Sequence, residues 1–267
     1  MDDTRFDTEQ VFTSNHYYYF FAEDLLPECI EREVAVIWKS LDLHPGMEVL
    51  DLACGNGRIA NALAARGCLV TGLDITPAFL EQARQRAVAG DLTATYHLGD
   101  MRALPWASCF DGIVNWRSAY GYFGDEENHQ VLGEAHRALR PGGKLLLDLN
   151  NREWVLKNFQ RSSVIEHEGN YLVDQRHYDV CSGRVSTQRV ILFEGQQSHM
   201  RFFVREFSYH ELAAWLRQAG FGHVSGYDWE GHSFSLHSQR MLVVAEKEGS
   251  STATGDAPLA VDHLMLL

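Results

Sequence analysis

Short apolar runs alternate with helix-like segments between residues 30 and 150, and this alternation restricts the possible folds more than any other feature of the sequence. Strands are expected at 48–52, 69–73, 95–98, 110–114 and 144–148. Helices are expected at 58–66, from Pro77 to Gly90 and at 126–139, with a turn at 140–143. Strands and helices that alternate in this way pack as a parallel sheet with helices on both faces, and ligands bind beyond the carboxyl ends of the strands.

The pattern changes after Asn150. Residues 163 to 207 contain short alternating runs that are separated by turn sequences such as Glu168-Gly169-Asn170 and Glu194-Gly195, which predicts an antiparallel insertion. Helical spacing resumes at Ser208, which should form a capping box with Glu211, and Gly220 should end that helix. Two last strands are expected at 223–227 and 240–245.

These elements predict one domain over residues 1–248. Its parts are an N-terminal lid and helix in 1–44, a strand-helix core, and the insertion at 151–207 over the active site. The 267 residues, 45% of them hydrophobic, are enough to bury such a core. Residues 249–267 begin with a stretch rich in Ser, Thr, Gly and Ala, which predicts a disordered tail.

Composition and charge exclude several classes of partner. The net charge of −13 argues against a nucleic-acid partner, because binding a polyanion requires a basic surface. The N-terminus lacks the basic and apolar regions of a signal peptide, and no apolar run is long enough to span a membrane, so a cytoplasmic protein is expected. Five scattered cysteines without a CxxC pair argue against disulfides and a structural metal site.

The loop after the first strand could serve two cofactor classes. Gly55-x-Gly57-x-x-Ala60 followed by Asp74 fits the dinucleotide fingerprint. Asp51, however, ends the first strand, where its carboxylate would repel a pyrophosphate and attract the ammonium and sulfonium of S-adenosylmethionine. In the alternative interpretation the Asp51 carboxylate only accepts hydrogen bonds from the backbone N–H groups of the glycine loop and stabilises its conformation. This role is compatible with either cofactor.

The ends of the next strands carry further candidate ligands. Asp74 can accept both ribose hydroxyls, or it can cap the helix that begins near Thr76. Asp100 can accept from the adenine amino group while Met101 covers one face of the base, although a solvated loop aspartate is the simpler interpretation. The segment Asn115 to Tyr120 follows the fourth strand and should face the reactive end of the cofactor.

Together these residues resemble the class I S-adenosylmethionine-dependent methyltransferases over roughly residues 45 to 150. Val49 to Gly57 is similar to the family's first motif, Gly72-Leu73-Asp74 to its second and Gly99-Asp100 to its third, and 139–145 resembles the segment before its fifth strand. Ala53 stands where many members have a glycine. The resemblance implies a doubly wound α/β fold with a seven-stranded, mostly parallel sheet of order 3-2-1-4-5-7-6, in which strand 7 is antiparallel, and an antiparallel β insertion after strand 5.

The resemblance also implies the chemistry. The cofactor would be S-adenosyl-L-methionine, the product S-adenosyl-L-homocysteine, and the reaction an in-line methyl transfer to an O or N atom of a small-molecule acceptor, with no metal required. The aromatic run 15–21 could fold over the cofactor as a lid, and its tyrosines could bind the methionine carboxylate or the sulfonium. A hydroxyl acceptor would need a general base, for which His16, His210, His232 and His237 are candidates, each of which can also be an ordinary surface residue.

Two sets of site residues are therefore predicted. The expected catalytic residues are His16, Tyr18, Arg117 and Tyr120. The expected cofactor-binding residues are Tyr18, Asp51, Ala53, Gly55, Gly57, Asp74, Ile75, Asp100, Met101, Asn115 and Trp116.

Alternative functions and assemblies stay open. One is an S-adenosylmethionine-binding protein with a non-methylating role, such as a cyclase, or with a regulatory role; a NAD(P)-dependent oxidoreductase is another. The aromatic N-terminus and the apolar end at 264–267 could exchange between subunits and form a homodimer.

Overall fold

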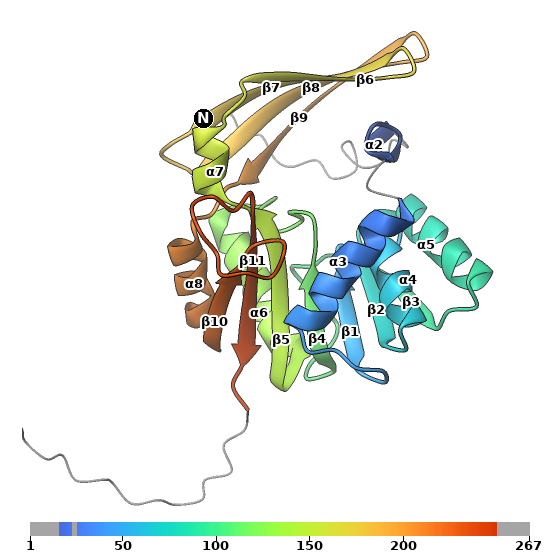
Figure 1. The fold of residues 1–267 in the computed structure, drawn as a ribbon, viewed down its shortest axis with the longest axis vertical. Helices are drawn as coiled ribbons and strands as arrows, with labels where there is room; N and C mark the ends of the chain where they lie inside the picture. Colours follow the sequence, from blue (N-terminus) through green and yellow to red (C-terminus); the bar gives the residue numbers. More distant parts are fainter. Residues whose placement is uncertain (1–15, 23–25, 250–267) are drawn as a thin grey trace, which may run out of the picture.

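The computed structural model describes residues 16–22 and 26–249, and its centre is a seven-stranded sheet (Figure 1). The strands are β1 (Glu48–Leu52), β2 (Leu69–Asp74), β3 (Ala94–Leu98), β4 (Phe110–Asn115), β5 (Leu139–Asn150), β10 (Phe221–Tyr227) and β11 (Arg240–Lys247). Their order is β10-β11-β5-β4-β1-β2-β3, and β11 is antiparallel to both of its neighbours. The expected order 3-2-1-4-5-7-6 with an antiparallel seventh strand is confirmed.

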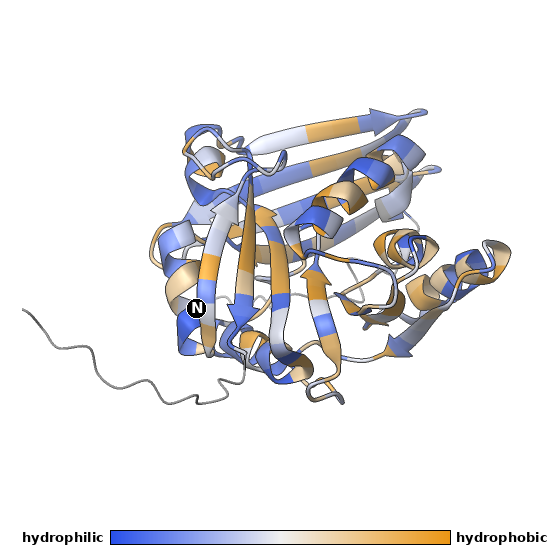
Figure 2. Cartoon of the chain, turned by 60° about the horizontal axis from the view of Figure 1, so that its bottom comes forward, coloured by the Kyte–Doolittle hydropathy of each residue, from blue (hydrophilic) through white to orange (hydrophobic). Residues whose placement is uncertain are grey.

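Helices cover both faces of this sheet. The helices are α3 (Pro27–Ser40), α4 (Arg58–Ala65) and α5 (Pro77–Ala89) on one face, and α6 (Asp125–Ala138) and α8 (Tyr209–Gln218) on the other. Alternation along β1 sends Val49 into one apolar cluster and Leu50 and Leu52 into the other, as the two-residue period of a strand requires. Figure 2 shows hydrophobic stretches along the strands of the sheet and both hydrophobic and hydrophilic residues on the helices.

The insertion after β5 stands over the carboxyl ends of the parallel strands (Figure 1). It begins with α7 (Arg152–Lys157) and continues as a four-stranded antiparallel sheet. Its strands, in spatial order, are β6 (Ser162–His167), β7 (Asn170–Asp179), β8 (Arg184–Phe193) and β9 (Gln196–Arg205). The short helix α2 (His16–Phe20) packs against this sheet through Phe20, which belongs to one apolar cluster with Leu172 and Ile191. The expected antiparallel insertion is confirmed.

Some local expectations were wrong in detail. Residues 140–143 were expected as a turn but belong to β5, where they form a bulge. Phe110 of β4 pairs with Leu139 of β5 and Gly112 pairs with Lys144, so residues 140–143 stand opposite Asp111 alone. Thr76 occupies the N-cap position of α5, where a threonine is expected to cap the helix, but its side chain makes no capping hydrogen bond; the Thr76 N–H donates to Asp74. Only half of the capping box at α8 forms: Ser208 accepts the Glu211 N–H at 3.2 Å, whereas the Glu211 carboxylate pairs with Arg205.

The described residues contain no helix that combines the length and the apolar character needed to cross a membrane. Asn15 of the expected lid, residues 250–267 of the expected tail and the apolar end at 264–267 lie outside the described residues.

Candidate active site

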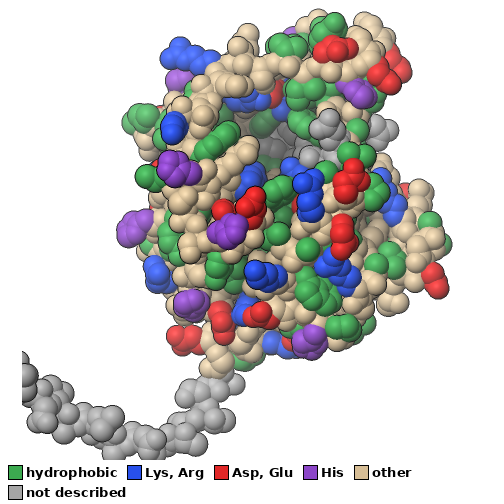
Figure 3. Space-filling model, in the orientation of Figure 1, with side chains coloured by type: hydrophobic (Ala, Val, Ile, Leu, Met, Phe, Trp, Pro, Cys, Tyr) green, Lys and Arg blue, Asp and Glu red, His purple; other side chains and the backbone are tan. Residues whose placement is uncertain are grey.

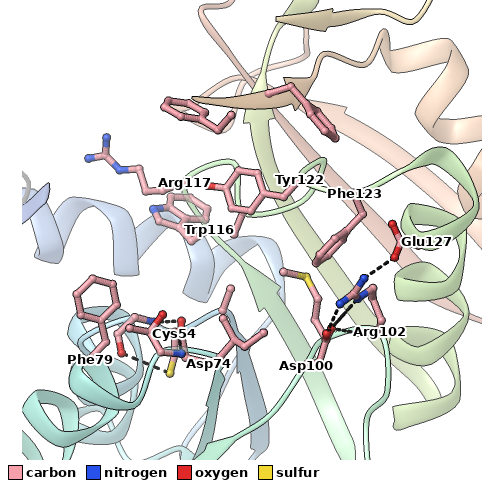
Figure 4. A pocket seen from close by; sticks show the side chains of 18 of the residues that line it. Cys54, Asp74, Phe79, Asp100, Arg102, Trp116, Arg117, Tyr122, Phe123 and Glu127 are labelled. Atoms are coloured by element: carbon pink, nitrogen blue, oxygen red, sulfur yellow. Dashed lines mark hydrogen bonds and ion pairs between the residues drawn. The ribbon is translucent and has the colours of Figure 1, made fainter. Parts of the chain in front are cut away.

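A cavity of about 1120 Å³ lies between the carboxyl ends of the central strands and the insertion. Its floor is the loop after β1 with the ends of β2 and β3, its wall is the segment after β4, and its roof is formed by β8 and β9 (Figure 4). Figure 3 shows the molecule hollowed beneath the insertion, with acidic and basic side chains interspersed on this face. The volume slightly exceeds the range of about 300–1,000 Å³ for small-molecule sites, so two ligands can share it.

The loop between β1 and α4 forms the floor with left-handed backbone at three positions. Ala53, Gly55 and Gly57 have φ values of 63°, 53° and 75°. A side chain at Gly55 would be strained by the left-handed backbone, and its Cβ would lie 2.8 Å from the Tyr18 hydroxyl, which would have to move. Ala53 adopts the same backbone region at a steric cost of about 1–2 kcal/mol, which a glycine at this position would avoid.

Asp51 lies near the end of β1, and its buried carboxylate has hydrogen-bonding and electrostatic partners for only part of its charge. Its side chain is 2% exposed, and Oδ2 has no hydrogen-bond partner among the described residues. Burial raises the pKa of Asp51 to about 7, although Arg58 and the Ala60 N–H act in the opposite direction. A buried oxygen of this kind stabilises a cationic group that enters the cavity.

Asp74 ties the floor together. Its Oδ2 accepts the Gly55 N–H at 2.8 Å and its Oδ1 accepts the Thr76 N–H at 2.8 Å. Burial raises the pKa of Asp74, against the effect of these hydrogen bonds. Each carboxylate oxygen has a second lone pair, so Asp74 can hold the loop and still accept hydroxyls from a ligand.

Asp100 is held by an arginine that the sequence interpretation did not consider. Arg102 donates to both Asp100 oxygens, with Nη2 at 2.6 Å from Oδ2, and also pairs with Glu127 at the start of α6 (Figure 4). Burial by itself would raise the pKa of Asp100, but the hydrogen bonds from Arg102 outweigh it and hold the pKa below its ordinary value. The Asp100 carboxylate is thus a fixed acceptor and not a freely solvated loop residue.

Aromatic and apolar side chains complete the cavity wall. Met101 and Trp116 are buried there, and Ile75 is more exposed. Trp116 stacks on Trp229 with ring centroids 6.5 Å apart. Tyr18 lies over the glycine loop, where its hydroxyl accepts the Asn56 N–H at 3.3 Å and its ring meets Phe79 edge-on. The aromatic helix α2 therefore reaches the floor of the cavity, as a lid would.

Four expected site residues do not line this cavity. His16 packs against Phe193 of the insertion, and Tyr120 is 1% exposed, with its hydroxyl donating to the Asn128 carbonyl at 3.1 Å. Asn115 donates to the Leu52 carbonyl, and Gly57 faces Ala83 and Tyr96 on the far side of the loop. Gly57, Asn115 and Tyr120 lie at or after strand ends, and His16 lies on the short helix α2; at none of these positions does the sequence reveal which way the side chain or the backbone faces.

The other candidate bases are also elsewhere. His210, His232 and His237 are exposed, and none of the described histidines lines the cavity. The three lie on α8 and in the loop between β10 and β11, so the structure gives them no access to a bound acceptor.

A buried carboxylate on α3 organises two arginines of the cavity. Glu33 is 1% exposed and pairs with Arg58 at the start of α4 and with Arg117 after β4, whose Nε lies 2.9 Å from Oε1. The sequence interpretation missed Glu33. The signal was available: Glu33 is on the same helix face as Val34 and Ile37, and a carboxylate on an apolar face needs a partner.

Comparisons with known proteins agree on a domain type. Residues 49–143 match the family described as "Methyltransferase domain". The chain is 34% identical over 145 residues to "Methyltransferase GfsG" of Streptomyces halstedii, covering 51% of each protein. The chain spans 37% to 51% of the length of the first curated relatives that it matches.

Solved structures share the fold. A structure described as an S-adenosylmethionine-dependent methyltransferase from Clostridium acetobutylicum superposes with a TM-score of 0.75 at 14% identity, covering 88% of this chain and 97% of that one. The S-adenosylmethionine-bound amino pentose methyltransferase CalS10 from Micromonospora echinaspora superposes at 0.63 with 21% identity, covering 89% and 97%. At these identities the likeness establishes the fold.

Proposed function

We propose that the chain is a class I S-adenosylmethionine-dependent methyltransferase, which transfers the methyl group of S-adenosylmethionine to a nitrogen or oxygen atom of a small-molecule acceptor. The methyltransferase-domain match over residues 49–143 and the shared fold support this proposal. The observation that carries the proposal is the Oδ2 of Asp51, which has no hydrogen-bond partner in the described part of the chain and is buried at the floor of a cavity large enough for cofactor and acceptor. The amino pentose acceptor in the CalS10 title supports an acceptor of this size.

The residues of the floor fit this cofactor. The Asp51 carboxylate suits the ammonium group of the methionine part, and Asp74 has lone pairs left for the ribose hydroxyls. Asp100 is oriented by Arg102 to accept from the adenine amino group, while Met101 and Ile75 offer apolar surface to the base. A pyrophosphate would instead meet two buried carboxylates, Asp51 and Asp74.

The chain's own task in such a transfer is alignment and exclusion of water. The bound sulfonium supplies an activated methyl group. Tyr18 covers the floor, Trp116 forms part of the wall, and the insertion lies over the cavity. No described histidine lines the cavity, which favours an amine: an amine that binds uncharged attacks with its lone pair and loses its proton to solvent afterwards.

The proposal is tested by calorimetric titration with S-adenosylmethionine, S-adenosylhomocysteine and reduced nicotinamide dinucleotides. Micromolar binding of the sulfonium compound is expected, followed by methylated product when small amines and alcohols are added. Binding of a nicotinamide nucleotide without affinity for S-adenosylmethionine would contradict the proposal, and binding without product from any acceptor would favour the non-methylating alternative.

Cofactor binding should weaken as the pH falls. Burial raises the pKa of Asp51 to about 7, and a cationic ligand binds the ionised form, so protonated Asp51 must lose its proton on binding. Affinity at about pH 6 should be about tenfold lower than its limit above pH 8, with close to one proton released. Calorimetry in two buffers of different ionisation enthalpy measures this proton. An affinity independent of pH would separate Asp51 from the ligand.

Replacing Asp74 with alanine should weaken cofactor binding by about 1.5–3 kcal/mol, since a charged acceptor of ligand hydroxyls is lost. The same change also frees the Gly55 and Thr76 N–H groups, so thermal unfolding has to be measured alongside. Glu81→Ala, at an exposed position on α5, is the matched control. Unchanged affinity would assign Asp74 to holding the loop alone.

Three expectations about the surroundings of the protein stay predictions: a cytoplasmic location, a homodimer and the absence of a nucleic-acid partner. Gel filtration with light scattering tests the homodimer directly.

A further inference from the structure

Arg201 lies in the roof of the cavity without an anionic partner. Arginines contribute to the cavity lining at five positions: 58, 102, 117, 184 and 201. The first four are paired: Arg58 and Arg117 with Glu33, Arg102 with Asp100 and Glu127, and Arg184 with Asp125. The Arg201 side chain makes no ion pair or hydrogen bond with any residue that the structure describes. Its charge is therefore available to a ligand.

The local strand geometry places further donors beside this guanidinium. Arg201 stands opposite Gln188 on β8, and Phe203 stands opposite Ser186. Neighbours across a ladder lie on the same face of the sheet, so the Gln188 amide and the Ser186 hydroxyl flank Arg201.

The backbone of β9 adds to this group. β9 is the edge strand of the insertion, and the Arg205 N–H points away from β8 and donates to the Gly121 carbonyl at 2.9 Å. Alternate residues of a strand direct their N–H groups to the same side, so the N–H groups of residues 203 and 201 also point away from β8. Both residues line the cavity.

Charge is divided between the two ends of the cavity. Asp51 and Asp74 lie at the floor, which suits a cationic ligand and repels an anionic one. Arg201 lies in the roof. In a chain with a net charge of −13, an anionic acceptor is repelled unless a local cation receives it. The guanidinium is weakly hydrated and binds carboxylates and phosphates through two parallel hydrogen bonds.

We propose that Arg201, flanked by Gln188, binds an oxyanion carried by the acceptor, either a carboxylate or a phosphate. The acceptor is then an anionic small molecule whose charged group lies in the roof while its methyl-accepting atom points to the floor. This inference rests on the proposed methyl transfer, because it assigns the acceptor of that same site.

The test uses the full chain saturated with S-adenosylhomocysteine, titrated in calorimetry with pyrophosphate and, separately, with succinate. At least one probe should bind, and the probe that binds more tightly separates a phosphate from a carboxylate subsite. Arg201→Ala should weaken this binding tenfold or more, and Arg201→Lys should weaken it less, since the charge is kept but the two-pronged geometry is lost.

Arg161→Ala is the matched control, because Arg161 is exposed directly before β6 of the same insertion and does not line the cavity. It should bind the probes as the unmodified protein does. Equal affinity of Arg201→Ala and the unmodified protein, or no binding of either probe, overturns the proposal. Affinity for S-adenosylhomocysteine is measured first, in the unmodified protein and in every variant. If the unmodified protein does not bind S-adenosylhomocysteine, the proposed methyl transfer itself is contradicted. If it binds S-adenosylhomocysteine but neither anion, only the anion subsite in the roof is contradicted.

Discussion

Replacing Asp51 with asparagine is expected to weaken S-adenosylmethionine binding about 100-fold or more. The carboxylate is buried at the floor of the cavity, and its Oδ2 lacks a partner among the described residues. Removing one member of a buried ion pair costs about 3–5 kcal/mol, because the other charge is left without compensation. Here the uncompensated charge would be the ammonium group of the ligand.

The same substitution should make the cofactor-free protein more stable at about pH 8. Burial raises the pKa of Asp51 to about 7 in the folded chain, from an ordinary value of 3.8. A raised pKa means that the folded state holds a proton that the unfolded state has lost, so the contribution of Asp51 to stability falls as the pH rises from about 4 to about 7. Asparagine removes this penalty but leaves amide hydrogens unpaired, and we expect a net gain of about 1–3 kcal/mol.

Denaturant unfolding and calorimetry of the same samples check both effects. Glu81→Gln removes one negative charge from the exposed surface of α5 and should change neither quantity. A variant that loses affinity together with stability would point to a damaged loop, and a variant that keeps its affinity would contradict the cationic ligand at Asp51.

The sheet could be predicted from the sequence because its signals are local. β1 was expected at 48–52 and begins and ends there, and Gly220 follows α8 with φ at 103°, as a helix-ending glycine does. The insertion could be recognised from Glu168-Gly169 and Glu194-Gly195, whose left-handed backbones form tight hairpin turns. Strand order, in contrast, came from the resemblance to a family, since periodicity does not define which strands are neighbours.

Site residues could be predicted from the sequence only at positions that the path of the backbone fixes, namely strand ends and the glycine loop. Asp51, Gly55 and Asp74 lie at strand ends and in the loop, and the structure brings them together at the floor. Tyr120 was expected in the site because it follows β4, but its ring stacks on Phe207 in the core. Side-chain direction after a strand depends on the path of the loop, and Arg117 and Ser118 turn that path through left-handed backbone.

Long-range pairs are the part that a single sequence hides. Glu33 is 25 residues from Arg58 and 84 from Arg117, so neither pairing follows from spacing on one helix. The basic Arg58 at a helix N-terminus is unfavourable for the helix dipole, which indicates that its charge is used elsewhere. In the folded chain this charge forms an ion pair with Glu33 and lowers the pKa of Asp51 against the effect of burial.

Replacing Glu33 with glutamine should therefore destabilise the protein by about 3–5 kcal/mol, since two arginines lose their buried anionic partner. Glu31→Gln, on the same helix, removes an ion pair to Arg66 whose glutamate side chain is 70% exposed, and should cost about 0–1 kcal/mol. Denaturant unfolding of both variants measures the difference, and equal stabilities would show that Glu33 is not a buried partner.

A second measurement on Glu33→Gln separates loss of packing from a specific effect on Asp51. Arg58 already lowers the pKa of Asp51 against the effect of burial, and without Glu33 its guanidinium is free to turn fully toward that carboxylate. The pKa of Asp51 should then fall below 7, and the pH at which cofactor affinity declines should fall with it. Affinity above that pH should also decrease, because Arg58 competes with the cofactor's ammonium group. If the pH midpoint stays near 7 while stability is lost, Glu33 holds α3 in place without controlling the charge of the site.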